Sequence, residues 1–192
     1  SLVPGWGYPA TDNIFVNRLS QNHINDIYIG RVAASTPQDA AIYLEKVMQH
    51  EDSLRYGKEM WMKRAIHLGG GSDAAEQTII KNNLYKWKSV LEAPAFGGNV
   101  TTFLKTSTEP IQIIQSQQLK NLINDGVRIM TFYGHGSATG FDISIDEVNS
   151  YSNEGKYPLV IVNSCYSGDL FNKIYTKSEE FVLTEKKGAI AY

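Results

Sequence analysis

The chain has 192 residues, enough for one domain with a sizeable buried core. Its 42% hydrophobic and 20% charged residues are typical of a globular protein. A net charge of −2 without any Lys/Arg run argues against a nucleic-acid surface, and no apolar stretch is long enough to span a membrane. The single cysteine excludes an internal disulfide and a cysteine-rich zinc site, and the histidines lack metal-ligand spacing, so we expect no metal.

The two ends of the chain predict a piece of a longer protein. Residues 1–25 are rich in Gly, Pro, Asn and Tyr and are expected to form an irregular lead-in. The sequence does not begin with an initiator Met or show a signal-peptide pattern. Residues 189–192 resemble a strand that has just begun. We therefore expect the chain to be cut inside a domain.

Strand-like and helical patterns alternate along the chain. Apolar runs predict strands at about 26–29, 64–68, 100–104, 127–133, 159–163 and 189–192. Helical patterns are predicted from Pro37, from Asp73 to beyond Trp87, from Pro110 to Asp125, after Ser144, and from about 178 to 186. This alternation predicts an α/β fold with a mainly parallel sheet. We expect Trp61 and Trp87 to lie in its core.

Two of the predicted strands end in loops that carry reactive side chains. The run at 159–163 leads into Ser164-Cys165-Tyr166-Ser167-Gly168-Asp169, and the run at 127–133 leads into Gly134-His135-Gly136-Ser137. In a parallel sheet, the loops beyond the carboxyl ends of the strands form the ligand crevice. If the two strands are adjacent and parallel, Cys165 and His135 face each other there, as a cysteine nucleophile and its base do.

The backbone of the same loops suits acyl transfer. Gly136 has no side chain, so its N–H can approach a developing oxyanion, and the N–H of Cys165 can be a second donor. A lone cysteine after an apolar strand is also typical of a small buried hydrophobe, and Gly-His-Gly alone is only a turn. The presence of both features, each at a strand end, favours the catalytic interpretation.

Residues 134–137 and 163–169 resemble the catalytic motifs of the gingipain family of cysteine peptidases. The similarity extends upstream to Asp26-Ile27-Tyr28-Ile29-Gly30-Arg31 and to the helical stretch 45–51. It implies a three-layer caspase-like sandwich, His135 and Cys165 as a catalytic dyad, and the amides of Gly136 and Cys165 as the oxyanion hole. It also implies protein or peptide substrates and no cofactor.

The resemblance carries further expectations about organisation and location. It implies that residues 1–192 are part of a gingipain-type peptidase domain, with an N-terminal subdomain and a C-terminal end outside the chain. It also implies a secreted or cell-surface protein of a Gram-negative bacterium, at the outer membrane, with other components of the type IX secretion system as partners.

The sequence departs from the family at two places. Arginine-specific gingipains carry Glu where this chain has Ala138, and the family's acidic residue that orients the histidine falls near Gly69-Gly70-Gly71. The sequence therefore offers no orienting carboxylate at that position.

Three carboxylates have alternative interpretations. Asp73 lies near the family's acidic residue that receives a basic P1 side chain, although a helix N-cap that forms a capping box with Glu76 is the simpler interpretation. Asp142 and Asp146 are candidates for calcium binding or for the substrate cleft, or are a loop residue and a residue of a first helical turn.

The leading hypothesis is a cysteine endopeptidase that acts through Cys165, His135 and a thioester intermediate. If the chain is instead related to the sorting peptidase of the type IX system, the acyl group would pass to an amine. The third hypothesis is a non-catalytic caspase-like scaffold, which the missing orienting carboxylate and Ala138 favour.

Overall fold

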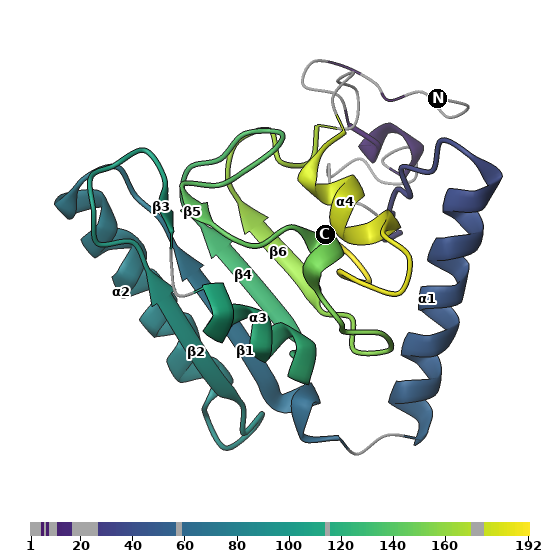
Figure 1. The fold of residues 1–192 in the computed structure, drawn as a ribbon, viewed down its shortest axis with the longest axis horizontal. Helices are drawn as coiled ribbons and strands as arrows, with labels where there is room; N and C mark the ends of the chain where they lie inside the picture. The colour runs from purple at the N-terminus through teal and green to yellow at the C-terminus, as the bar shows by residue number, and fades with distance from the viewer. Residues whose placement is uncertain are drawn as a thin grey trace.

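The computed structural model describes residues 5, 7, 11–16, 27–56, 59–113, 116–169 and 175–192. Its centre is a parallel sheet of four strands in the order β2-β1-β4-β6 (Figure 1). These strands are β1 (Arg64–Gly69), β2 (Asn99–Leu104), β4 (Ile129–Tyr133) and β6 (Leu159–Asn163). Helices flank the sheet, so the predicted α/β sandwich with a mainly parallel sheet is confirmed.

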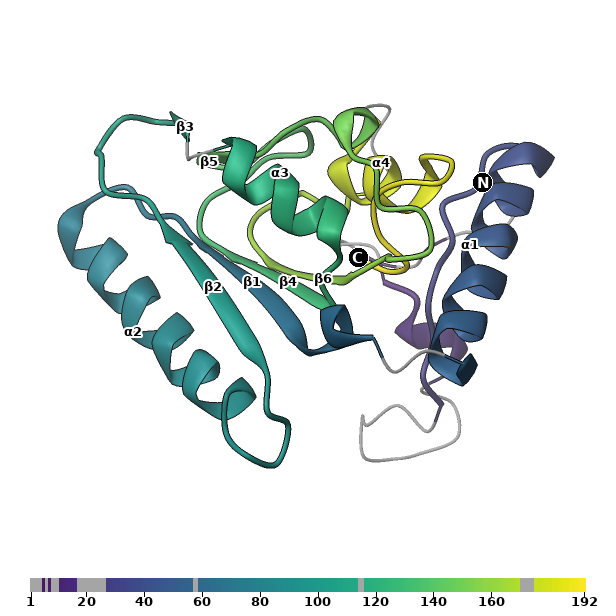
Figure 2. The ribbon, with the colours of Figure 1, turned by 60° about the horizontal axis from the view of Figure 1, so that its bottom comes forward.

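Helices cover both faces of the sheet. Figure 2 shows α2 (Ala74–Leu91) and α3 (Ser116–Asp125) on opposite sides. Side chains alternate along each strand, so Ile66 and Leu68 of β1 belong to the core that also contains residues of α3 and of α4 (Lys177–Leu183). Other members of this core are Leu119, Ile123, Met130, Phe132, Val160 and Phe181.

Helix α1 (Pro37–Tyr56) packs against α4 beside the sheet. Its Lys46 is buried, and Nζ donates hydrogen bonds to the carbonyls of Phe181, Val182 and Ala189 at 3.1, 2.9 and 3.2 Å. A cation at the C-terminal end of a helix is favoured by the carbonyls exposed there. Burial acts in the opposite direction and lowers the pKa of Lys46 to about 7. Lys46 thus attaches α1 to the end of α4.

Four of the six predicted strands are confirmed, because buried parallel strands appear as continuous apolar runs. The predicted strand at 189–192 is reduced to a parallel bridge between Leu159 and Ala191. The prediction for 26–29 is wrong over residues 27–29, which are exposed and irregular; residue 26 lies outside the described residues. Two short strands that were not predicted, β3 (Gln112–Ile113) and β5 (Ile143–Ser144), pair in parallel.

The helices begin and end close to the predicted positions, with two differences. Helix α3 begins at Ser116 and not directly after Pro110, because β3 occupies part of that interval. The segment after Ser144 contains only a 3₁₀ turn, η3 (Val148–Ser150). Trp61 is buried as expected, but Trp87 is 38% exposed, since its ring lies on the surface of α2 and stacks on Tyr133 at 5.8 Å. Two further 3₁₀ turns are η1 (Asn13–Phe15) and η2 (Met60–Lys63).

Most of the predicted irregular lead-in, residues 1–25, lies outside the described residues. Within the described ranges, no helix is both long enough and apolar enough to cross a membrane.

Candidate active site

The His135 loop and the Cys165 loop leave the same edge of the sheet from neighbouring strands. Strands β4 and β6 pair in parallel, and Tyr133 is opposite Asn163. His135 and Cys165 each come two residues after this last pair. The predicted adjacency of the two strands is therefore confirmed.

The two loops are in direct contact. The backbone N–H of Gly134 donates to the carbonyl of Asn163 at 3.3 Å. At Gly136, a Cβ atom would lie 2.4 Å from Oγ of Ser164, the residue before the cysteine. A side chain at position 136 would require the Ser164 hydroxyl to move, so the lack of one lets the histidine loop lie against the cysteine loop as observed.

The beginning of α4 also connects the two loops. The N–H of Lys177 donates to the carbonyl of Ala138 at 2.9 Å, and the N–H of Ser178 donates to the carbonyl of Ser167 at 3.2 Å. These are the N–H groups that a helix leaves without intrahelical partners. One helix end thus holds a residue of each loop.

Cys165 is a free, exposed thiol. The interpretation of this residue as a small buried hydrophobe is therefore wrong. The next residue, Tyr166, has φ +58°, which is rare for a bulky side chain and indicates a sharp turn. The turn closes with a hydrogen bond of 3.1 Å from the N–H of Asp169 to the carbonyl of Tyr166.

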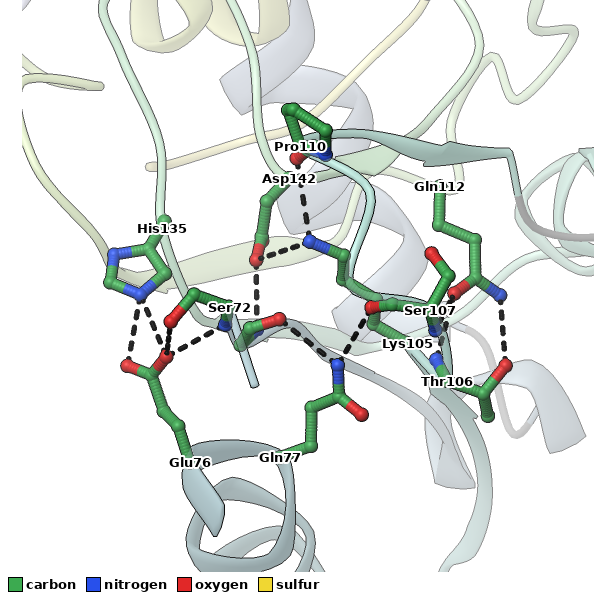
Figure 3. A network of polar contacts seen from close by, with 11 residues as sticks. Ser72, Glu76, Gln77, Lys105, Thr106, Ser107, Pro110, Gln112, His135 and Asp142 are labelled. Atoms are coloured by element: carbon green, nitrogen blue, oxygen red, sulfur yellow. Dashed lines mark hydrogen bonds and ion pairs between the residues drawn. The ribbon is translucent and has the colours of Figure 1, made fainter. Parts of the chain in front are cut away.

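The imidazole of His135 contacts a carboxylate of α2. Both carboxylate oxygens of Glu76 lie 2.9 Å from Nε2 of His135 (Figure 3). The same carboxylate accepts hydrogen bonds from the N–H and the hydroxyl of Ser72, each at 2.7 Å. The Ser72 N–H, followed by His135 and the Ser72 hydroxyl, lowers the pKa of Glu76 to about 2. Glu76 is therefore ionised at neutral pH.

Asp73 caps α2 as predicted, but the reciprocal half of the capping box is wrong. Oδ1 of Asp73 accepts from the N–H groups of Ala75 and Glu76, both at 2.9 Å. The side chain of Glu76 contacts Ser72 and His135 and does not return to the Asp73 N–H. Sequence reasoning missed this contact because 59 residues separate Glu76 from His135. The available signal was that α2 begins just after β1, which is the neighbour of β4.

The glycines at 69–71 make room for a buried acid. A Cβ at Gly70 would lie 2.1 Å from Oδ1 of Asp142, and the N–H of Gly71 donates to Oδ2 at 2.7 Å. Nζ of Lys105 lies 3.5 Å from the same oxygen, and the two side chains are only 2% and 7% exposed. Asp142 is therefore part of a buried ion pair and not a residue of an open cleft. The described residues contain no group of three His, Cys, Asp or Glu side chains that could hold a metal ion.

Asp142 lies directly beneath the histidine loop. Its N–H donates to the carbonyl of His135 at 2.9 Å, and Gly136 and Phe141 form an antiparallel bridge within the same loop. Figure 3 shows how Asp142 and Lys105 lie beside the contact between His135 and Glu76. The loop that presents the imidazole is thus supported by a buried pair of charges.

An α/β sandwich with a histidine loop and a cysteine loop at adjacent strand ends is the arrangement of a caspase-like cysteine peptidase. The model of peptidase family C25 matches residues 1–192, and the chain belongs to this family. The chain is 20% identical to gingipain R2 of Porphyromonas gingivalis in an alignment 191 residues long, which covers 93% of this chain and 24% of that protein. It is 22% identical to Lys-gingipain HG66 of the same species in an alignment 194 residues long, which covers 94% of this chain and 10% of that protein.

Solved structures support the same fold. The crystal structure of the Arg-specific cysteine proteinase gingipain R matches with a TM-score of 0.70 and 15% identity, over 98% of this chain and 44% of that one. A complex of the pro- and mature domains of the Porphyromonas gingivalis proteinase RgpB matches with a TM-score of 0.72 and 16% identity, over 98% of this chain and 45% of that one. The gingipain-type caspase-like fold is therefore established, whereas the chain spans a quarter or less of these curated relatives.

Proposed function

We propose that the protein is a cysteine endopeptidase in which Cys165 is the nucleophile and His135 is its base. The observation that carries the proposal is the exposed thiol in a sharp turn, on a loop that contacts the histidine loop at the shared edge of β4 and β6. An exposed cysteine on a loop that contacts a histidine loop is suited to act as a nucleophile with that histidine as its base.

The proposed reaction has two stages. The thiol of Cys165 gives its proton to His135, and the sulfur attacks the carbonyl carbon of the scissile peptide bond. The N–H groups of Gly136 and Cys165 stabilise the oxyanion, and each such donor contributes about 2.7–4 kcal/mol to transition-state stabilisation. His135 then protonates the leaving amine, and water hydrolyses the thioester.

Asp73 is the candidate for selecting a basic P1 side chain. The helix cap uses Oδ1 for both of its hydrogen bonds, and no described residue donates to Oδ2. The second oxygen of this exposed carboxylate is therefore available for a charge-assisted hydrogen bond with Arg or Lys of a substrate. The cap and the selector are compatible roles of one side chain.

The proposal extends to substrates and location. Protein or peptide substrates follow from membership of a peptidase family. A secreted or cell-surface location in a Gram-negative bacterium, with partners in the type IX secretion system, follows from the resemblance to gingipains. The alternative in which an amine replaces water uses the same thioester, so the two differ in the acceptor alone.

The test is cleavage of a labelled casein by the complete protein, together with labelling by a thiol-reactive peptide probe. We expect Cys165→Ala to abolish both, while the free energy of unfolding changes by less than about 1 kcal/mol because the thiol is exposed. Ser164→Ala is the matched control, since it removes one heavy atom from the neighbouring residue, and we expect it to retain cleavage. Cleavage that survives Cys165→Ala would place the nucleophile elsewhere. An unreactive Cys165 would favour the non-catalytic scaffold.

A further inference from the structure

We propose that Glu76 is the positioning residue for His135, and that it selects the imidazole tautomer in which Nε2 carries the proton and Nδ1 is the basic nitrogen. Glu76 does not contact the substrate or the reacting atoms in this scheme. The effect on catalysis rests on the proposed function, whereas the choice of tautomer is a property of the resting protein.

The tautomer follows from the chemistry of the contact. An ionised carboxylate accepts hydrogen bonds and cannot donate them. Because both oxygens of Glu76 lie 2.9 Å from Nε2, that nitrogen must be the donor. In a neutral imidazole the other nitrogen is then the acceptor, so Nδ1 is the atom that can take a proton from the thiol of Cys165.

Glu76 is itself held in place on a rigid element. Its carboxylate accepts two hydrogen bonds from Ser72, and its own N–H donates to Oδ1 of Asp73. It occupies the third position of α2, where the N-terminal end of the helix favours a negative charge. A carboxylate fixed in this way can orient a histidine that is 55% exposed and that would otherwise rotate in solvent.

Helix α4 shows what a glutamate at this position does when it only caps. Glu179 also occupies the third helical position, and its carboxylate accepts from the N–H and the hydroxyl of the cap residue Thr176, at 2.7 and 2.9 Å. Glu76 instead accepts from Ser72, which precedes the cap residue, and this arrangement brings its carboxylate to His135. The two glutamates therefore form a matched pair of which only Glu76 contacts the imidazole of His135.

The substitution Glu76→Gln separates positioning from simple packing. The amide oxygen of Gln can replace Oε2 and keep both Ser72 hydrogen bonds and the contact with Nε2, whereas the NH₂ group replaces Oε1, so the second acceptor and the negative charge are lost. The isosteric variant thus keeps the packing and one acceptor for the Nε2 proton, whereas Glu76→Ala removes both acceptors and the charge. We expect Glu76→Ala to lower kcat roughly 100-fold or more, with KM little changed, and Glu76→Gln, which keeps one acceptor, to be less impaired. Glu179→Gln, the control, should retain kcat within about twofold.

The second measurement is ¹⁵N NMR of histidine-labelled protein, with the His135 signals assigned by their loss in His135→Ala. We expect the Nε2–H tautomer in the parent protein and a mixture of tautomers in Glu76→Ala. An Nδ1–H tautomer in the parent, or no change in Glu76→Ala, would overturn the inference whatever the activity is. So would a Glu76→Ala variant that keeps the kcat of the parent protein. If the parent shows no cleavage that depends on Cys165, the proposed function fails, while the tautomer measurement still decides the role of Glu76.

Discussion

Each member of the buried pair of Lys105 and Asp142 is expected to be essential to the stability of the protein as long as the other is present. At the observed separation of 3.5 Å, Coulomb attraction with an effective dielectric constant of about 20 amounts to about 5 kcal/mol. The desolvation of both charges offsets much of this gain, so the pair as a whole contributes little. Removing one partner alone leaves a buried charge without compensation, and we expect Lys105→Met to cost about 3–5 kcal/mol.

The assay is a double-mutant cycle of the free energy of unfolding, measured in urea with Lys105→Met, Asp142→Asn and the double variant. We expect the double variant to be less destabilised than the sum of the single variants, with a coupling energy of about 2–3 kcal/mol. The control cycle uses Lys186 and Glu154, which lie 3.6 Å apart but are each 52% exposed, and should give less than about 1 kcal/mol. Equal coupling in the two cycles would refute the reasoning, because burial would then make no difference at almost the same distance.

Three further predictions concern single residues. Gly188→Ala should destabilise the protein more than Gly155→Ala, as measured by thermal or urea unfolding. Both glycines have positive φ, so either substitution carries a conformational cost of about 1–2 kcal/mol. At Gly188 a Cβ would in addition lie 2.2 Å from the carbonyl oxygen of Phe181, whereas Gly155 has open space around it. Asp73→Asn should preserve stability and Asp73→Ala should cost about 1 kcal/mol, while a larger loss of turnover in Asp73→Asn for Arg or Lys peptides than for neutral ones would mark Asp73 as the P1 selector. Because the pKa of Glu76 falls from 4.5 to about 2 on folding, its stabilisation is complete above pH 4.5, and the difference in unfolding free energy from Glu76→Gln should disappear as the pH falls towards 2.

The sheet was predictable because its signal is local. The runs at 64–68, 100–104, 127–133 and 159–163 are apolar enough to be strands of a buried parallel sheet. The helical segments between them are the crossover connections that parallel strands need. The apolar run at 26–29 has the same local pattern but no neighbouring strand within the described residues, and it is exposed over 27–29. An apolar run shows that a segment is able to form a strand, but the strand forms only where a neighbouring strand is available for hydrogen bonding.

The candidate site was predictable where it depends on strand ends and not where it depends on contacts between distant side chains. The adjacency of the two loops follows from the order of β4 and β6. The partners of His135 and Asp142 do not, because Glu76 and Lys105 precede them by 59 and 37 residues and belong to other elements. Capping propensity correctly predicted Asp73 as the cap residue of α2. It did not predict the hydrogen-bond partners of Glu76, because they depend on the tertiary structure.

The glycine run and the position of Glu76 are two consequences of one packing arrangement. Position 70 cannot carry any side chain, because a Cβ there would overlap the buried carboxylate of Asp142. The carboxylate that contacts His135 comes instead from another element on the same edge of the sheet. The first turn of α2 is such an element, since α2 follows β1, and β1 lies next to β4. In the sequence, the lack of an acidic residue at 69–71 favours a non-catalytic scaffold. Because Glu76 contacts the imidazole of His135, that lack is no longer an argument against catalysis.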